Sequence, residues 1–216
     1  MSDDKNTKGY ARAGTAVRKR GKARVSDILT AAQNILVRTG LANLTTRSVA
    51  DELGISLGNL AYYFPSKDAL LQAIIENVIE GYDKEFQRKI ESFPDNPEER
   101  LKAFLRYLID DAKKPEVQSF FYQFWGLATH HPQAAKSRAA MYKHFSSQTL
   151  FLLRDVHPNT QSEELENMSF GLLASIEGLH VIFGSGDIER IHSAEFDDYI
   201  YRQLMNMAGI DSGPMK

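Results

Sequence analysis

The residues best suited to recognising another molecule lie close together between Thr45 and Lys67. This segment contains an amide, Asn59, and two adjacent phenols, Tyr62 and Tyr63, among small and apolar residues. An Asn amide can pair with the edge of a nucleic-acid base, and Tyr hydroxyls and Lys ammonium groups donate hydrogen bonds to phosphate. The chemistry that this combination favours is recognition of a polyanion, with no bond made or broken.

Two short helices are expected to position these side chains. Thr45 can cap the first, and Ser56 can cap a second, very short one that ends before Pro65. Gly54 provides the tight turn between them, which gives the layout of a helix-turn-helix. In this layout the second helix enters the major groove of DNA. Gly58 costs roughly 1 kcal/mol relative to Ala inside a helix, and close approach to another backbone would explain its presence.

The outward-facing side chains of this pair are the candidate DNA contacts. Thr46 and Arg47 begin the first helix, and Lys67 begins the helix that follows the pair, where free N–H groups also attract phosphate. The predicted DNA-binding residues are Thr46, Arg47, Ser56, Leu57, Gly58, Asn59, Ala61, Tyr62, Tyr63 and Lys67.

A longer run of short motifs surrounds these contacts. They are Thr45–Ala50, Gly54-Ile55-Ser56, Gly58-Asn59-Leu60, Tyr62-Tyr63-Phe64 and Lys67–Leu71. As a run, within residues about 25–75, they resemble the DNA-binding domain of TetR-type transcriptional regulators. Ala61 stands where that family often has Tyr, and Tyr63 where it often has His, so no operator sequence can be transferred from the family.

The resemblance implies a homodimer with two N-terminal DNA-binding heads and a pseudo-palindromic operator. It places the dimer contact in the last two long helices, about 162–184 and 193–208. Small residues on the first of these would allow close approach, and they are Gly171, Ala174, Ser175 and Gly178. The resemblance also implies a small-molecule effector that binds between the fourth and eighth helices and weakens DNA binding.

An unusually aromatic helix, beginning at Pro115, marks the region where we expect this pocket. Five of the six residues at 120–125 are aromatic, so they cover more than one helix face. The functional interpretation is a cavity for an apolar or aromatic effector, and the alternative is aromatic packing plus an interface. The candidate ligand-binding residues are Phe121, Tyr122, Trp125, Tyr142, Phe145 and His180.

Charge is divided unevenly along the chain. Residues 1–67 contain 11 Lys or Arg against 5 Asp or Glu, and residues 68–216 contain 15 against 23. A basic end on an acidic body favours a polyanion partner for one end only, and a solvated basic tail without a partner is the alternative. The predicted regions are a disordered basic tail at 1–23, a helix-turn-helix domain at 24–70, and a ligand-binding and dimerisation domain at 71–210.

Apolar residues repeat at intervals of three and four after Arg24, which predicts an all-α fold of about nine helices. No apolar run approaches the roughly 18 residues of a membrane span, and the 216 residues contain no Cys, so we expect a cytoplasmic protein. His130 and His131 are adjacent and share no helix face. No catalytic motif is present. We therefore predict no metal, no cofactor and no catalytic residue.

The leading hypothesis is a dimeric, non-enzymatic repressor that a small effector releases from its operator. An activator of the same fold and a helical enzyme acting on the pocket ligand are the alternatives. A further alternative is an accessory factor that binds DNA non-specifically through the basic tail.

Overall fold

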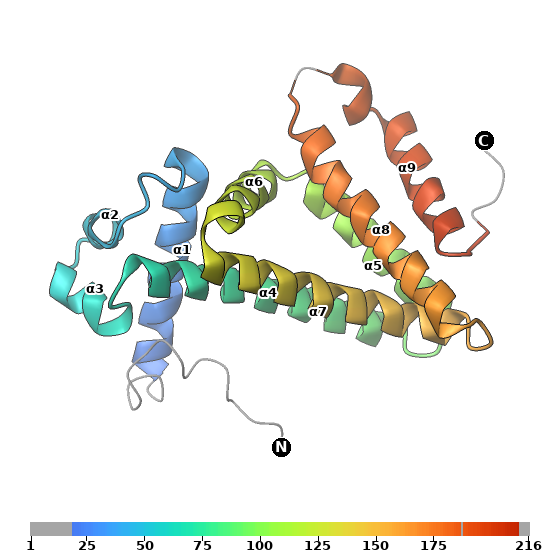
Figure 1. Cartoon of the computed structure of the whole chain (residues 1–216), viewed down its shortest axis with the longest axis horizontal. Coiled ribbons are helices and arrows are strands. Elements are labelled where there is room, and N and C mark those ends of the chain that lie inside the picture. The colour runs from blue at the N-terminus through green and yellow to red at the C-terminus, as the bar shows by residue number, and fades with distance from the viewer. Residues whose placement is uncertain (1–18, 187, 212–216) are drawn as a thin grey trace. The chain divides into compact units, whose positions relative to one another are not determined.

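The computed structural model describes residues 19–186 and 188–211 (Figure 1). Within these residues the chain is all-α, as predicted, with one short 3₁₀ turn at Glu189–His192 and no strand. The helices are α1 (Lys19–Thr39), α2 (Thr46–Glu52), α3 (Leu57–Tyr63), α4 (Lys67–Ser92), α5 (Pro97–Ala112), α6 (Pro115–His130), α7 (Pro132–Val156), α8 (Ser162–Phe183) and α9 (Ala194–Met207).

The basic tail predicted at 1–23 is described only in part. Residues 1–18 lie outside the described residues. Residues 19–23 differ from the prediction, because they form the first turn of α1. Lys, Arg and Ala are strong helix formers, so this segment continues the helix toward the N-terminus despite lacking an apolar stripe.

Local capping fixes most helix ends at the expected positions. The side chains of Ser56, Asn96 and Ser193 each accept a hydrogen bond from the backbone N–H three residues later, at 3.1 Å. Gly40 follows α1 with a φ of 86°, a left-handed conformation that favours Gly after a helix. The predicted boundaries therefore follow from interactions within a few residues of each helix end.

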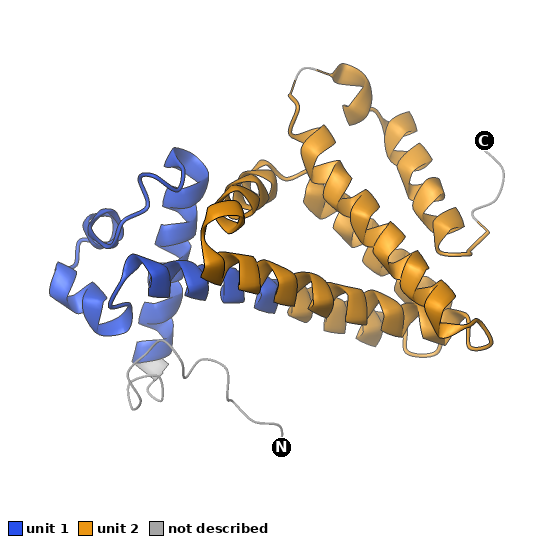
Figure 2. Cartoon of the chain, in the orientation of Figure 1, with its two compact units in different colours: residues 1–81 blue, residues 82–216 orange. Residues whose placement is uncertain are grey.

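Contacts divide the chain into two compact units, Met1–Gly81 and Tyr82–Lys216, with the boundary inside α4 (Figure 2). In the first unit, α2 packs against α1 and α3. Its fully buried side chains include Ile28, Ala32, Leu44, Val49 and Leu60.

In the second unit, α8 packs against α5, α6, α7 and α9 (Figure 1). A continuous apolar core joins α5, α7, α8 and α9 to the last part of α4, and Leu101, Ile109, Leu152, Leu172 and Met205 are among its buried members. No helix in the described part of the chain is long and apolar enough to cross a membrane.

Candidate DNA-binding surface and ligand cavity

The helix α2 and the turn after it place α3 on the surface of the first unit. The hydroxyl of Thr45 accepts a 2.9 Å hydrogen bond from the backbone N–H of Ser48, and the Ser48 hydroxyl accepts one from the backbone N–H of Thr45, so the two residues form a capping box. Gly54 has a φ of 62°, which allows the tight turn between α2 and α3. Local sequence therefore dictates this helix pair.

One face of α3 is buried and the other is open to solvent. Leu60 is fully buried, whereas Leu57, Asn59 and Tyr62 are exposed. A Cβ added to Gly58 would meet no atom of the described residues within 4 Å, so packing among these residues does not require a glycine there. The predicted base-reading and phosphate-binding side chains of α3 thus remain available to a partner.

The predicted contacts outside α3 differ in their surroundings. Arg47 and Ser56 are exposed, and Thr46 is half-buried. The ammonium group of Lys67 donates a 2.9 Å hydrogen bond to the backbone carbonyl of Leu41. Because a Lys ammonium carries three N–H groups, this bond orients Lys67 and leaves further donors for phosphate.

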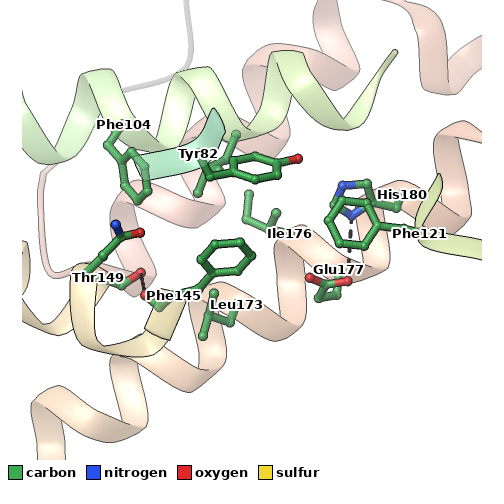
Figure 3. A pocket seen from close by; sticks show the side chains of 11 residues that line it. Tyr82, Phe104, Phe121, Phe145, Thr149, Leu173, Ile176, Glu177 and His180 are labelled. Atoms are coloured by element: carbon green, nitrogen blue, oxygen red, sulfur yellow. Dashed lines mark hydrogen bonds and ion pairs between the residues drawn. The ribbon is translucent and has the colours of Figure 1, made fainter. Parts of the chain in front are cut away.

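The second unit contains a cavity with about 440 Å³ of empty space, part of which opens to solvent (Figure 3). The helices α4, α5, α6, α7 and α8 all contribute to its wall. The lining residues are Tyr82, Phe104, Leu108, Phe121, Phe145, Gln148, Thr149, Leu173, Ile176, Glu177 and His180.

Two titratable groups share one end of the cavity, where Figure 3 shows Glu177 and His180 beside Phe121. Burial raises the pKa of Glu177 to about 7, against the opposite effect of the Tyr142 hydroxyl. Burial also lowers the pKa of His180 to about 4, so its ring is neutral near pH 7. His180 Nδ1 lies 3.9 Å from Glu177 Oε2. A neutral ring at that distance forms neither an ion pair nor a hydrogen bond with the carboxylate.

Within the described part of the chain, three buried polar atoms of the lining side chains lack a hydrogen-bond partner. They are Gln148 Oε1, Glu177 Oε2 and His180 Nδ1. Leaving such a group unpaired costs about 1–3 kcal/mol, so a ligand that pairs with any of them recovers that cost. The cavity is therefore apolar along its aromatic wall and has polar atoms to which an occupant could hydrogen-bond.

Three of the six predicted ligand-binding residues line this cavity, namely Phe121, Phe145 and His180. The other three lie outside its lining and are engaged elsewhere. Trp125 Nε1 donates a 2.8 Å hydrogen bond to the Tyr142 hydroxyl, and the Tyr122 hydroxyl donates to the carbonyl oxygens of His180 and Val181. Some aromatic residues of this segment thus line the cavity, whereas others form hydrogen bonds within the structure.

Sequence reasoning missed several lining residues, above all Tyr82, Gln148 and Glu177. Tyr82 follows Val78 and Ile79 at helical spacing on α4, so its sequence pattern is that of an ordinary core residue. Glu177 did leave a signal, because it is a single carboxylate in the apolar middle of α8, three residues before His180. A lone charge within an apolar stretch of helix is a candidate for a functional site.

The small residues of α8 lie on two different faces of the helix. A Cβ on Gly171 would lie 3.0 Å from the Met207 sulfur, so this glycine permits close packing of α9 within the same chain. Ala174 and Gly178 are exposed instead. They lie on one exposed face with Phe170, whose exposed fraction is 57%.

Two family models match the chain. The model described as "Bacterial regulatory proteins, tetR family" matches residues 28–74, and "BetI-type transcriptional repressor, C-terminal" matches residues 97–195. Together they cover more than half of the chain, including α2, α3 and most of the cavity wall. The chain belongs to the TetR family. It is therefore a helix-turn-helix transcriptional regulator, and the family resemblance of residues 25–75 is confirmed.

Curated relatives agree with this assignment. The HTH-type transcriptional regulator BetI of Stenotrophomonas maltophilia is 26% identical over 141 residues, which are 65% of this chain and 70% of that protein. BetI of Burkholderia lata is 27% identical over 158 residues, which are 72% of this chain and 79% of that protein.

Solved structures show the same fold. A transcriptional regulator from Rhodococcus sp. Rha1 has a TM-score of 0.71 and 20% identity over 88% of this chain and 99% of its own. A regulator from Saccharomonospora viridis, solved in complex with choline, has a TM-score of 0.65 and 20% identity over 87% of this chain and 96% of its own.

Proposed function

We propose that this TetR-family regulator is a repressor that binds a pseudo-palindromic operator as a homodimer and leaves it when a small effector enters the cavity of the second unit. The observation that carries the proposal is that one chain combines an outward-facing α3 with a cavity whose buried polar atoms lack partners. The first feature suits DNA recognition, and the second suits ligand binding.

The DNA-binding roles follow from the exposure of α3. Asn59 would read a base edge in the major groove, while Tyr62, Tyr63 and Lys67 would donate hydrogen bonds to phosphates. Gly58, at which an added Cβ would touch nothing in residues 19–186 and 188–211, would allow the backbone of α3 to approach the DNA closely.

The dimer would form along the exposed face of α8. Phe170, Ala174, Gly178 and Val181 follow one another at intervals of four, four and three, so they form one stripe along the helix. Phe170 and Val181 are the large apolar members of this stripe, and both are exposed in the single chain. An apolar stripe with small residues at its centre suits close packing against a second copy.

The cavity favours an effector with an apolar body and a cationic or hydrogen-bond-donating group. Two of its three unpaired atoms, Gln148 Oε1 and Glu177 Oε2, belong to acceptor groups. Aromatic rings such as Phe121 also attract cations through their faces. The choline complex of the Saccharomonospora viridis regulator gives independent support for a cationic ligand in this fold.

Selection of bound duplexes from a random DNA pool, at near-physiological salt, tests the DNA half of the proposal. We expect a palindromic consensus that the purified homodimer binds far more tightly than random duplex. Enrichment of no sequence would contradict the proposal, and equal affinity for all duplexes would favour an accessory DNA-binding factor.

A matched pair of compounds tests the effector half. Choline and its neutral isostere 3,3-dimethyl-1-butanol have nearly the same shape and differ in charge. We expect choline to raise the melting temperature and release the operator in the wild type, and to do neither in Glu177→Gln. Equal effects of both compounds would favour a neutral apolar effector. Conversion of choline to a product would instead favour the enzyme alternative.

A reporter gene placed behind the selected operator determines the sign of regulation. We expect expression to fall when the protein is present and to recover when the effector is added. Expression that rises with the protein would identify an activator of the same fold.

A further inference from the structure

One side of α3 presents apolar side chains to solvent. Leu57, the first residue of the helix, has a large apolar side chain and is 42% exposed. Ala61, four residues later and on the same side of the helix, is also exposed. Gly58 lies beside them and has no side chain. The helical repeat places these three residues within an arc of about 100°, and together they form the exposed apolar face of α3.

Other residues anchor α3 to the first unit. Leu60 and Phe64 are 0% and 1% exposed. The backbone N–H of Leu60 donates a 3.1 Å hydrogen bond to the carbonyl of Ser56, and that of Phe64 donates a 2.9 Å hydrogen bond to the carbonyl of Leu60. Because these contacts hold the helix, shortening Leu57 or Ala61 changes the exposed surface and leaves the packed side of α3 in place.

The exposed apolar face differs in chemistry from the rest of the exposed surface of α3. Asn59 and Tyr62 are exposed outside it and carry an amide and a phenol. The residues of the apolar face have no hydrogen-bonding group in their side chains, so they cannot read the donor and acceptor pattern of a base pair. The apolar group that bases present in the major groove is the C5-methyl group of thymine. An apolar face on a DNA-reading helix therefore favours thymine.

The charge of this part of the chain favours a nucleic acid, rather than a second protein, as the partner of the apolar face. Residues 1–67 contain 11 Lys or Arg against 5 Asp or Glu. Such an excess of positive charge attracts a polyanion. The tetR-family model matches residues 28–74, which include all of α3.

We propose that Leu57 and Ala61 select thymine in each operator half-site through contact with its C5-methyl group. This inference rests on the proposed function, because it requires α3 to lie in the major groove. Side chains four residues apart on a helix are about 5–6 Å apart, and successive bases of a strand are about 3.4 Å apart. The two contacted base pairs therefore lie one or two steps from each other.

The test measures the affinity of the full-length protein for the selected operator with one thymine at a time replaced by deoxyuracil. Uracil pairs with adenine as thymine does and lacks only the methyl group, so the protein stays wild type. Loss of one buried methyl contact should lower affinity about 4-fold when one half-site is changed and about 16-fold when both are changed. Thymines outside the contacted positions should show almost no response.

Two variants identify the side chain at each responsive thymine. Leu57→Ala should lose the uracil response at one position and keep it at the other, and Ala61→Gly should do the reverse. Asn59→Ala is the matched control, because it shortens a side chain of the same helix outside the apolar face. It should bind the operator more weakly and keep both uracil responses. Thermal melting of each free variant verifies that it is folded.

A different base can supply the same methyl group. Replacing a responsive T·A pair by C·G should weaken binding, since cytosine lacks the C5-methyl group. 5-Methylcytosine at that position should recover about 4-fold in affinity for the wild type. The variant that has lost the uracil response at that position should bind the methylated and unmethylated duplexes equally.

Two results would overturn the inference. One is an operator whose half-sites contain no thymine, or in which deoxyuracil replaces every thymine without loss of affinity. The other is a uracil response of wild-type size in both Leu57→Ala and Ala61→Gly, which would assign thymine selection to other side chains or to the shape of the DNA. Failure to select any operator duplex is a different outcome, because it contradicts the proposed function itself.

Discussion

Replacing Glu177 by Gln tests whether the cavity wall contains a destabilising buried carboxylate. Burial raises the pKa of Glu177 from 4.5 to about 7, so the protein is destabilised when this group ionises. A raised pKa gives stability that is fully present below about pH 4.5 and lost as the pH rises through about 7. With these two pKa values, ionisation of Glu177 lowers the free energy of unfolding by about 1 kcal/mol at about pH 5 and by about 3 kcal/mol at about pH 8.

Gln has nearly the same shape as Glu and stays neutral, so Glu177→Gln escapes this loss. We compare the free energy of unfolding of the variant with that of the wild type at two pH values. The difference in favour of the variant should be about 2 kcal/mol larger at about pH 8 than at about pH 5. Urea unfolding at both pH values and one protein concentration measures it. Glu166→Gln, which changes an exposed residue of α8, is the control and should show no such difference. Equal effects of Glu177→Gln at both pH values would refute the reasoning.

Asn59→Ala should cost about 1–3 kcal/mol of discrimination between operator and random duplex, and a parallel fall in both affinities would contradict base reading. Lys67→Ala should reduce the slope of log affinity against log salt by about one unit, whereas an unchanged slope would remove it from the phosphate contacts. Phe170→Glu should yield monomers in sedimentation, and a persisting dimer would exclude the α8 stripe. Gly184→Ala places a methyl group against the Tyr122 hydroxyl and within 2.9 Å of two of its ring carbons, so it should cost about 1 kcal/mol of stability in urea and much less in a Tyr122→Ala background, which lacks the ring.

The helix-turn-helix was predictable because its determinants are local. Thr45 and Ser56 cap helices within three residues of themselves, and Gly54 supplies the conformation of the turn between them. The alternation of buried and exposed residues on α3 follows from the helical repeat alone. A resemblance confined to residues 25–75 could therefore identify both the element and its family.

The ligand cavity was only partly predictable. The sequence marked α6 as aromatic, but it could not show that Trp125 and Tyr142 bond to each other while Phe121 lines the cavity. All three are aromatic residues on amphipathic helices, so their periodicity is indistinguishable. Which of them lines a cavity depends on how α6, α7 and α8 pack together.

The sequence by itself determined an all-α chain, most of its helix ends and an N-terminal DNA-reading element, because these depend on contacts within a few residues. Only the tertiary structure revealed the cavity, the perturbed pKa values of Glu177 and His180, and the link from Tyr82 to Asp111. Each depends on burial or on partners far apart in the chain, as Asp83 and Gln148 are at 65 residues. Helical periodicity shows which face of a helix is apolar. Helix packing decides which polar atoms are buried and which hydrogen-bond partners they find.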